Sequence, residues 1–282
     1  MTDTALSTPH SLLAEFRRRR DLAVVQPQGN LALVNTQWVD SPQPVYGVPG
    51  VWSPEGSGSR RLGVDVERLR VEASAVDDIR VGGVLVDGDA IVAGKDSPSP
   101  SSVVFSATVT GSVIASENGT YALRVWDSES EGIRDFGRID AFDYTTEWVI
   151  TAEWTEIIGG STVGIEHLKD EGVPREKTLP GEITFTKDGV DYNLAAFKDG
   201  RALLLVFADA TNGVSTYSVG RFLMVAPNSD GSITLDFNRA FLPPCGFSYN
   251  FNCPLPPKQN RFAVPIEAGE KNVLNRAGGL LH

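Results

Sequence analysis

Eight polar side chains in the C-terminal third of the chain have the types and spacing to support acid–base chemistry or ligand binding. The candidate acids and bases are Asp209, Tyr217 and Asp236, and the candidate ligand-binding residues are Arg221, Asn238, Arg239, Cys245 and Asn260. Alternation along a predicted strand puts Asp236 and Asn238 on the same face. An arginine in such a pocket can pair with a carboxylate or a phosphate through two parallel hydrogen bonds. The alternative is a buried network in which arginine and aspartate hold an irregular loop in place.

Cysteine and histidine are scarce, which narrows the metal and nucleophile chemistry of the chain. There are two cysteines, Cys245 and Cys253, and three histidines, two of them near the chain ends. A four-ligand zinc site is therefore not expected, and we predict no metal site. The cysteines are structural thiols, a disulfide or redox pair, or a nucleophile, and a reducing cytoplasm favours structural thiols. His167 is the remaining candidate acid or base, with a solvated loop histidine as the alternative.

The charge balance disfavours several classes of partner. The 282 residues carry a formal net charge of −11, which repels nucleic acid and anionic membranes. The basic run Arg17–Arg20 lies between acidic residues and predicts a solvated helix face. No stretch approaches the roughly 18 apolar residues of a membrane span, and the N-terminus lacks a secretory pattern. We expect a cytoplasmic protein that binds neither nucleic acid nor membrane, with its oligomeric state left open.

Apolar and polar residues alternate between turn dipeptides, which predicts a mainly β fold. An N-terminal helix and lead-in (residues 1–30) should precede a β-sandwich-like unit (31–153). Residues 154–181 are Gly-rich and charged, and they predict a linker or a loop that covers a site. A C-terminal antiparallel barrel or sandwich (182–271) and a tail (272–282) complete the expected organisation.

Several local patterns predict individual turns and strands. Asp87-Gly88 lies between two short apolar runs and predicts a hairpin, as does Asp188-Gly189. Residues 201–207 form an apolar run typical of a strand that is covered on both faces. The sequence shows neither a Gly-rich phosphate loop nor βαβ alternation, so we predict no cofactor.

The most unusual segment is Leu235–Lys271, whose Pro-Pro pairs cannot take part in a regular strand ladder. Together with residues 207–213 and 216–222, it resembles the hallmark of a bacterial and archaeal family known as domain of unknown function 1684. Weaker similarity is found at residues 121–127 and in the N-terminal helix. The resemblance implies a shared fold, and it carries no established activity.

The sequence departs from this family at two places. Within the Pro-rich segment, Gln259 stands where the family has a glutamate. The stretch after Trp38 carries Asp40-Ser41-Pro42 in place of the family's usual pattern. If the missing glutamate serves as an acid or base in the family, this member differs in activity.

Three functions are compatible with the sequence. The leading hypothesis is a cofactor-independent enzyme that applies acid–base chemistry to a small organic molecule, as an isomerase, cyclase or hydrolase. The second is non-catalytic binding of a small anionic ligand in the same pocket, which predicts a pocket with arginines and no poised acid or base. The third is a protein-interaction module that presents Phe247, Tyr249 and Phe251, which predicts an exposed aromatic patch.

Overall fold

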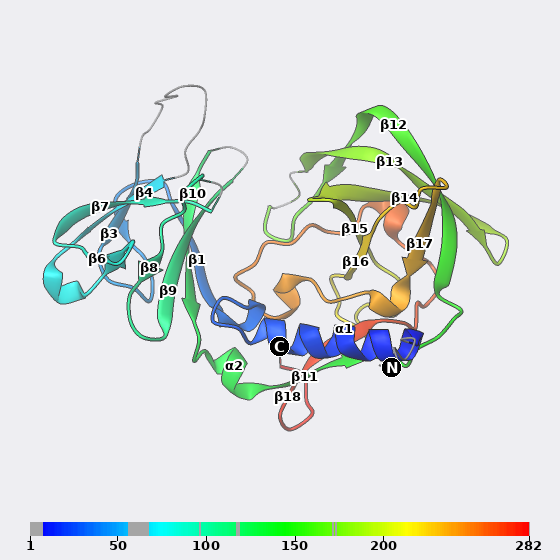
Figure 1. Ribbon diagram of the computed structural model, residues 1–282, viewed down its shortest axis with the longest axis horizontal. Coiled ribbons are helices and arrows are strands. Elements are labelled where there is room, and N and C mark those ends of the chain that lie inside the picture. Colours follow the sequence, from blue (N-terminus) through cyan, green and yellow to red (C-terminus); the bar gives the residue numbers. More distant parts are fainter. Residues whose placement is uncertain are drawn as a thin grey trace, which may run out of the picture. The chain divides into compact units, whose positions relative to one another are not determined.

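The computed structural model describes residues 8–55, 68–95, 97–116, 119–170, 172 and 174–281, and the fold is mainly β, as predicted (Figure 1). The chain forms two compact units. One contains residues 1–22 and 135–282, and the other contains residues 23–134. The sequence instead predicted a division between residues 153 and 154. The difference arises because β11 (Phe136–Ala141) pairs with β18 (Glu270–Asn275), which joins residues 135–153 to the C-terminal unit.

Unit 23–134 is a sandwich of two antiparallel sheets with strand orders β1-β10-β9-β8-β5-β6 and β2-β3-β4-β7. Its strands are β1 (Leu33–Val39), β2 (Gln43–Pro44), β3 (Val51–Pro54), β4 (Arg68–Ala73), β5 (Arg80–Val81), β6 (Val84–Leu85), β7 (Gly88–Ala93), β8 (Val103–Val104), β9 (Val109–Ala115) and β10 (Tyr121–Asp127). Both sheets contribute to one core, in which Trp52, Leu69 and Leu123 are fully buried. This arrangement matches the predicted N-terminal sandwich. Two 3₁₀ turns (Asn30–Ala32 and Ala75–Asp77) and α2 (Glu131–Asp135) complete its regular elements.

The hairpin predicted at Asp87-Gly88 is wrong. β7 pairs with β4, from Ala73↔Gly88 to Arg68↔Ala93, whereas β6 pairs with β5. The tight turn lies at Gly82-Gly83, where both glycines have positive φ angles of 61° and 84°. Two consecutive positive φ angles are what a two-residue hairpin turn requires. The glycine pair therefore forms the turn between β5 and β6.

The other unit is built on a six-stranded antiparallel sheet with the order β16-β15-β14-β13-β12-β17. Its strands are β12 (Val149–Ile165), β13 (Arg175–Lys187), β14 (Val190–Asp199), β15 (Ala202–Phe207), β16 (Arg221–Val225) and β17 (Ser232–Asp236). A bridge between Pro227 and Ile233 joins the two end strands, so the sheet curls toward a barrel. The C-terminal unit, predicted as an antiparallel barrel or sandwich, is a half-barrel, and its sheet begins at β12 and not at residue 182. The predicted turn at Asp188-Gly189 is confirmed, with positive φ at both residues.

Residues 154–181 do not form the predicted linker or covering loop. They lie largely in β12 and β13, which pair from Glu153↔Thr184 to Ile165↔Arg175 with an irregularity between Glu156 and Ser161. Gly159 and Gly160, both with positive φ, occupy this irregularity. Because a bulge accommodates extra residues within a strand pair, the Gly-rich sequence interrupts the strand pattern without ending the strands. The first residues of the predicted tail also belong to a strand, because β18 extends to Asn275 and pairs with β11.

Between β17 and β18, the Pro-rich segment packs on the barrel without a regular strand. It contains the 3₁₀ turns η3 (Phe237–Arg239), η4 (Pro244–Gly246) and η5 (Lys258–Asn260). Six of its residues belong to the barrel core: Leu235, Phe237, Ala240, Phe262, Ile266 and Ala268. The rings of Phe207, Phe237 and Phe262 meet edge to face there, with centroids 5.1–6.2 Å apart, a favoured aromatic arrangement.

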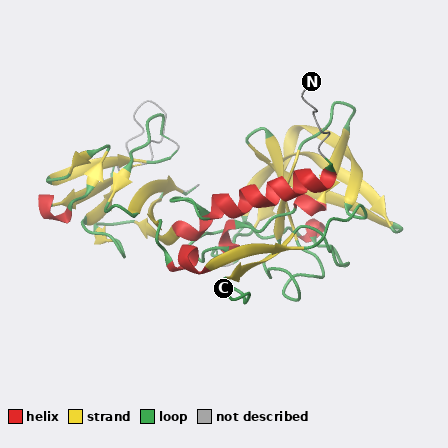
Figure 2. Ribbon diagram, turned by 60° about the horizontal axis from the view of Figure 1, so that its bottom comes forward, coloured by secondary structure: helices red, strands yellow, loops and turns green. Residues whose placement is uncertain are grey.

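Helix α1 (Pro9–Val24) runs alongside β11 and β18 (Figures 1 and 2). Arg18 and Arg19 pair with Glu15 on its exposed face. Arg20 instead makes two hydrogen bonds to Glu270, of 2.8 and 2.9 Å, and the side chain of Glu270 is only 2% exposed. Arg17 donates to the carbonyl oxygen of Phe142 at 2.6 Å. The predicted solvated face therefore holds for only part of the basic run, because the other arginines pack against the C-terminal strand pair.

None of the helices in the described part of the chain is long and apolar enough to cross a membrane.

Candidate functional site

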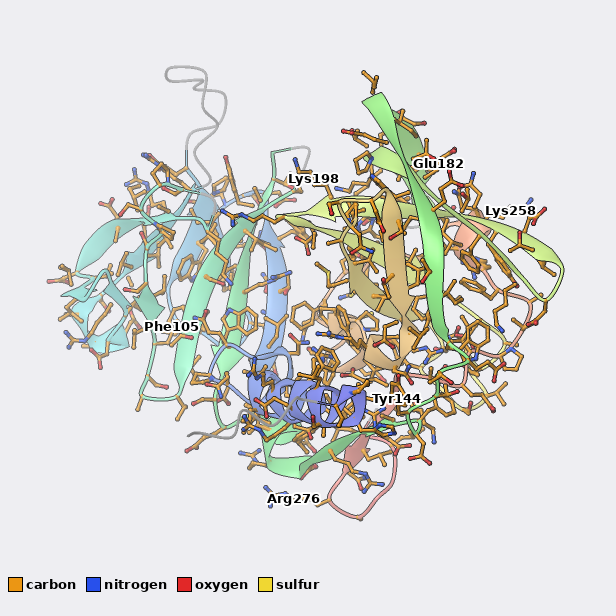
Figure 3. The ribbon with its side chains drawn as sticks, turned by 45° about the vertical axis from the view of Figure 1, so that its right-hand side comes forward. Phe105, Tyr144, Glu182, Lys198, Lys258 and Arg276 are labelled. Carbon is orange, nitrogen blue, oxygen red and sulfur yellow. The ribbon has the colours of Figure 1, made fainter. Side chains whose placement is uncertain are left out.

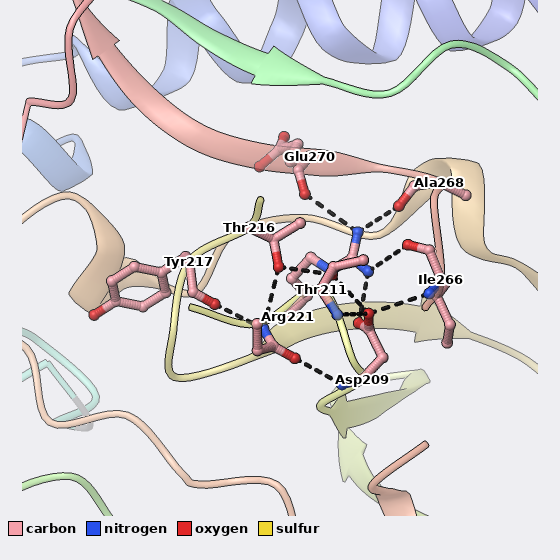
Figure 4. Close-up of polar contacts among 9 residues, drawn as sticks. Asp209, Thr211, Thr216, Tyr217, Arg221, Ile266, Ala268 and Glu270 are labelled. Atoms are coloured by element: carbon pink, nitrogen blue, oxygen red, sulfur yellow. Dashed lines mark hydrogen bonds and ion pairs between the residues drawn. The ribbon is translucent and has the colours of Figure 1, made fainter. Parts of the chain in front are cut away.

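Arg221 is the centre of a buried polar network (Figure 4). Its side chain is 0% exposed, and its Nη2 donates to Oδ2 of Asp209 at 2.7 Å and to the carbonyl oxygen of Ile266 at 2.8 Å. Its Nη1 donates to the carbonyl oxygens of Ala268 and Glu270. Burial lowers the pKa of Arg221, and the Asp209 carboxylate opposes that shift. One guanidinium thus fixes three backbone positions, two in the segment before β18 and one at the first residue of β18.

Both carboxylate oxygens of Asp209 also accept hydrogen bonds from groups of the protein. Its Oδ1 accepts hydrogen bonds from the backbone N–H of Thr211 at 2.9 Å, the Thr211 hydroxyl at 2.6 Å and the N–H of Ile266 at 3.1 Å. The hydroxyls of Thr211 and Thr216 are 2.8 Å apart. With Arg221 on its other oxygen, the carboxylate holds the 209–216 loop and the Pro-rich segment together. These contacts match the buried loop-holding network that the sequence left as an alternative.

Asn238 and Asp236 form a second, separate contact. The amide of Asn238 accepts from the N–H of Thr145 at 2.9 Å and donates to the Thr145 carbonyl and to Oδ1 of Asp236, both at 2.8 Å. The two residues meet because Asp236 caps the 3₁₀ turn that begins at Phe237. The expected strand alternation does not apply, since β17 ends at Asp236.

The remaining predicted residues lie in other places. Asn260 bonds the backbone of Ala195 and Val206. The exposed Arg239 lies over the ring of Phe16. Tyr217 donates its hydroxyl to the carbonyl oxygen of Cys245 at 3.1 Å. The structure therefore brings the eight residues together in small groups, most of which tie an irregular loop to the barrel, and their part in ligand binding stays a prediction.

A pocket of about 750 Å³ lies where the end of β12 meets the segment around η5. Its lining residues are Val163, Gly164, Glu166, Leu255, Pro256, Pro257, Lys258, Gln259 and Arg261. The two walls are joined by a hydrogen bond of 2.7 Å from the N–H of Leu255 to the carbonyl oxygen of Glu166. Prolines on one wall and a paired strand on the other give the pocket a backbone with little conformational freedom.

Comparison with known families shows where this chain belongs. The family described as "Protein of unknown function (DUF1684)" matches residues 134–271. The chain belongs to this family. The match begins one residue before the C-terminal part of the barrel-containing unit and ends within β18. The DUF1684 region thus includes both walls of the pocket, whereas the weaker resemblance at residues 121–127 and in the N-terminal helix lies outside it.

A search of the solved structures finds a solution NMR structure of an uncharacterized protein from Haloarcula marismortui. It is 32% identical to this chain, the match covers 48% of this chain and 77% of that one, and the TM-score is 0.39. A search of curated proteins finds no match.

Three charged side chains line the pocket between β12 and η5. They are Glu166, Lys258 and Arg261, and all three are exposed. Lys258 projects outward from the barrel in Figure 3. Among the described residues, none of these three charges lies in an ion pair. Gln259, where the resemblance implies a glutamate, lines the same pocket and donates to the carbonyl oxygen of Asn193 at 3.3 Å. It is an uncharged residue on a wall that carries two cations.

Sequence reasoning missed Glu166, Lys258 and Arg261 as site residues. The sequence offered one local indication. Lys258 and Arg261 lie on either side of Gln259, the position at which the sequence departs from the resemblance, and Lys258 directly follows a Pro-Pro pair. The opposite wall gave no signal, because residues 163–166 were expected to lie in a linker or loop.

His167 follows Glu166 and is 9% exposed, so it is not the solvated histidine that formed one alternative. Its Nδ1 lies 3.8 Å from Oδ2 of Asp170 and has no hydrogen-bond partner among the described residues. Asp170 accepts hydrogen bonds from Arg175 and Asn252, each at 2.8 Å from Oδ1. Burial, followed by the charge of Arg175, lowers the pKa of His167. The ring is therefore neutral at neutral pH.

This shift predicts a pH dependence of stability. Because the pKa of His167 is lower in the folded state than its unfolded value of about 6.5, the unfolded state binds the proton first as the pH falls. The folded protein should lose stability below about pH 6.5. His167→Gln should reduce that loss in urea unfolding measured at a series of pH values. A variant with the wild-type pH dependence would contradict the assignment, and Asp170, whose pKa is also lowered, contributes only at more acidic pH.

Proposed function

We propose that this chain binds a small anionic molecule, a carboxylate or a phosphate, in the pocket between β12 and η5. The observation that carries the proposal is the pair of exposed cations, Lys258 and Arg261, on one wall of a 750 Å³ pocket. Among the described residues neither cation takes part in an ion pair. The protein as a whole repels anions, because its net charge is −11. Lys258 and Arg261, beside a concave surface, form a local positive region to which anions are attracted.

The three polar groups of this wall have complementary capabilities. An arginine can bind a carboxylate or phosphate through two parallel hydrogen bonds, and a lysine adds a mobile point charge. The amide of Gln259 offers donors without the negative charge of the family's glutamate. Glu166 lies on the opposite wall and repels an anion, which favours a ligand whose negative groups are directed toward η5.

Binding is favoured over catalysis by the contacts of the predicted acids and bases. Asp209 and Asp236 already accept hydrogen bonds from protein groups, and the hydroxyl of Tyr217 donates to a backbone carbonyl. None of the three lines the pocket. The interaction hypothesis receives less support, because Phe247 and Phe251 are buried and only Tyr249 of the three aromatic residues is exposed.

Calorimetric titration with inorganic phosphate and with a small dicarboxylate tests the proposal. The wild-type protein should bind at least one of the two, and more weakly as salt is added. Lys258→Ala/Arg261→Ala should weaken binding at least about tenfold, because each lost charge-assisted hydrogen bond contributes roughly 1.5–3 kcal/mol. Glu166→Gln should tighten it, since a like charge is removed.

The matched control is Lys198→Ala/Arg201→Ala, which removes the same two charges from exposed positions of the same unit. It should bind the probe like the wild type. Equal weakening in both double variants would mean that only the net charge matters, and failure of the wild type to bind either probe would contradict the proposal.

A further inference from the structure

Cys245 and Cys253 form a hydrogen-bonded pair of thiols within the Pro-rich segment. The backbone N–H of Cys245 donates to Sγ of Cys253 at 3.3 Å. Neither of these two cysteines is part of a disulfide, and their side chains are 1% and 3% exposed. A contact between the backbone of one cysteine and the sulfur of the other brings the two residues close enough for a disulfide to form with little backbone movement.

The surroundings of Cys245 favour its thiolate. Its pKa is lowered, first by the hydrogen bond from Cys253 and further by Tyr217 and by the backbone N–H groups of Cys245 and Gly246, against an opposing effect of burial. Burial also raises the pKa of Tyr217, so its hydroxyl keeps the proton that it donates. A stabilised thiolate is the reactive form in thiol oxidation.

We propose that Cys245 and Cys253 are a redox modification site, at which a small peroxide converts the dithiol to a disulfide and a thiol reductant restores it. The Cys245 thiolate attacks one oxygen of hydrogen peroxide, the O–O bond breaks, and the departing hydroxide takes up a proton to give water and a sulfenic acid. Cys253 then attacks the sulfenic sulfur, the S–O bond breaks, and the thiol proton leaves with the hydroxide as a second water. Both sulfurs are oxidised, and one peroxide is reduced to two waters.

Burial controls access to this site. Because the side chains are 1% and 3% exposed, the peroxide and the thiol reductant reach the sulfurs only when the segment opens. The chain between the two cysteines has only 3₁₀ and turn structure, so it can adapt to a covalent bond without breaking a strand ladder. This chemistry does not depend on the proposed ligand.

Oxidation would act next to the pocket. The carbonyl oxygen of Cys253 accepts from the N–H of Leu168 at 3.0 Å, and the neighbouring Pro254 bridges to His167. Leu255 and Pro256, which follow Pro254 directly in the chain, line the pocket wall. A disulfide would therefore restrain the end of the segment that leads into this wall.

Mass spectrometry of the native full-length chain tests the site. The chain is exposed to hydrogen peroxide without denaturant and then alkylated. Trypsin releases residues 240–258 with both cysteines, because no lysine or arginine lies between Arg239 and Lys258. We expect this peptide to lose two hydrogens and two alkylation sites. Its chymotryptic fragments, cut at the aromatic residues between the cysteines, should stay joined until they are reduced.

Single variants separate disulfide formation from oxidation of one thiol. Cys253→Ser should stop at a sulfenic acid on Cys245 that a cyclic dione traps, and Cys245→Ser should react more slowly than the wild type. Tyr217→Phe should move the midpoint of the rate–pH profile of oxidation to higher pH, because Tyr217 contributes to the lowered pKa of Cys245. A merely structural tyrosine would leave that midpoint in place.

Three results would overturn the proposal. In the first, one thiol of the native wild type accumulates sulfinic acid while the other stays free. In the second, the chain forms intermolecular dimers instead of the internal bond. In the third, both thiols remain reduced under a peroxide excess that oxidises a free cysteine in the same tube.

Discussion

Replacing Arg221 with methionine is expected to destabilise the barrel unit by about 3–5 kcal/mol, the usual cost of removing one partner from a buried ion pair. Methionine fills much of the volume but offers no donor. Asp209 would keep a buried negative charge that has lost its partner at 2.7 Å. The carbonyl oxygens of Ile266, Ala268 and Glu270 would lose their donor at the same time. The segment between β17 and β18 would thus lose several of its attachments to the barrel.

The measurement must report on the barrel alone, because the chain has two units that need not unfold together. Hydrogen exchange of peptides from β15 and β16 at increasing urea concentrations does so. Arg18→Met on the exposed helix face is the matched control and should leave exchange unchanged. Adding Asp209→Asn to Arg221→Met should recover part of the loss. An Arg221→Met protein whose exchange matches that of Arg18→Met would refute the structural role of the network.

Asn260→Ala should cost the same unit about 3 kcal/mol, by leaving three buried backbone groups without partners at roughly 1 kcal/mol or more each. The amide of Asn260 accepts from the N–H of Ala195 and donates to the carbonyl oxygens of Ala195 and Val206, all at 2.8 Å. These contacts connect the Pro-rich segment to β14 and β15 at a residue that is 0% exposed.

Asn260→Asp distinguishes the hydrogen bonds from the volume of the side chain. The carboxylate keeps the shape and the acceptor but has no donor for the two carbonyls, so the loss should equal or exceed that of alanine. Neighbouring Gln259→Ala, which removes one exposed hydrogen bond of 3.3 Å, should change stability little. Urea unfolding followed by the same exchange peptides provides the comparison, and a stable Asn260→Asp protein would contradict the explanation.

The fold was predictable from the sequence where local chemistry decides the structure. Asp188-Gly189 makes a turn because both residues adopt positive φ. The apolar run at residues 201–207 becomes β15, which is largely buried. Asp87-Gly88 shows the limit, because the competing Gly82-Gly83 pair makes the turn and β7 finds its partner in β4. Which strands pair is decided by packing across the sandwich, and a dipeptide carries no information on that packing.

The candidate site was less predictable than the fold. The sequence placed Asp209 and Arg221 among the candidate site residues and left a buried arginine–aspartate network as an alternative. An ion pair in a pocket and one in a core require the same residue types, so the sequence could not distinguish them. The pocket joins residues 163–166 to residues 255–261 through one backbone hydrogen bond from Leu255 to Glu166. Contacts so far apart in the chain leave no periodic pattern. Gly159 and Gly160 further concealed β12 by interrupting its alternation.

The division of the chain into units has a consequence for how the protein is made. Residues 23–134 are inserted between two parts of the other unit, so α1 leaves the ribosome long before its partners. Arg20 and Glu270 are 250 residues apart, a gap of roughly 10–50 s at typical rates of synthesis. During that interval the inserted sandwich has all of its strands available and can fold first. The helix makes its contact between Arg20 and Glu270 only after β18 has been synthesised.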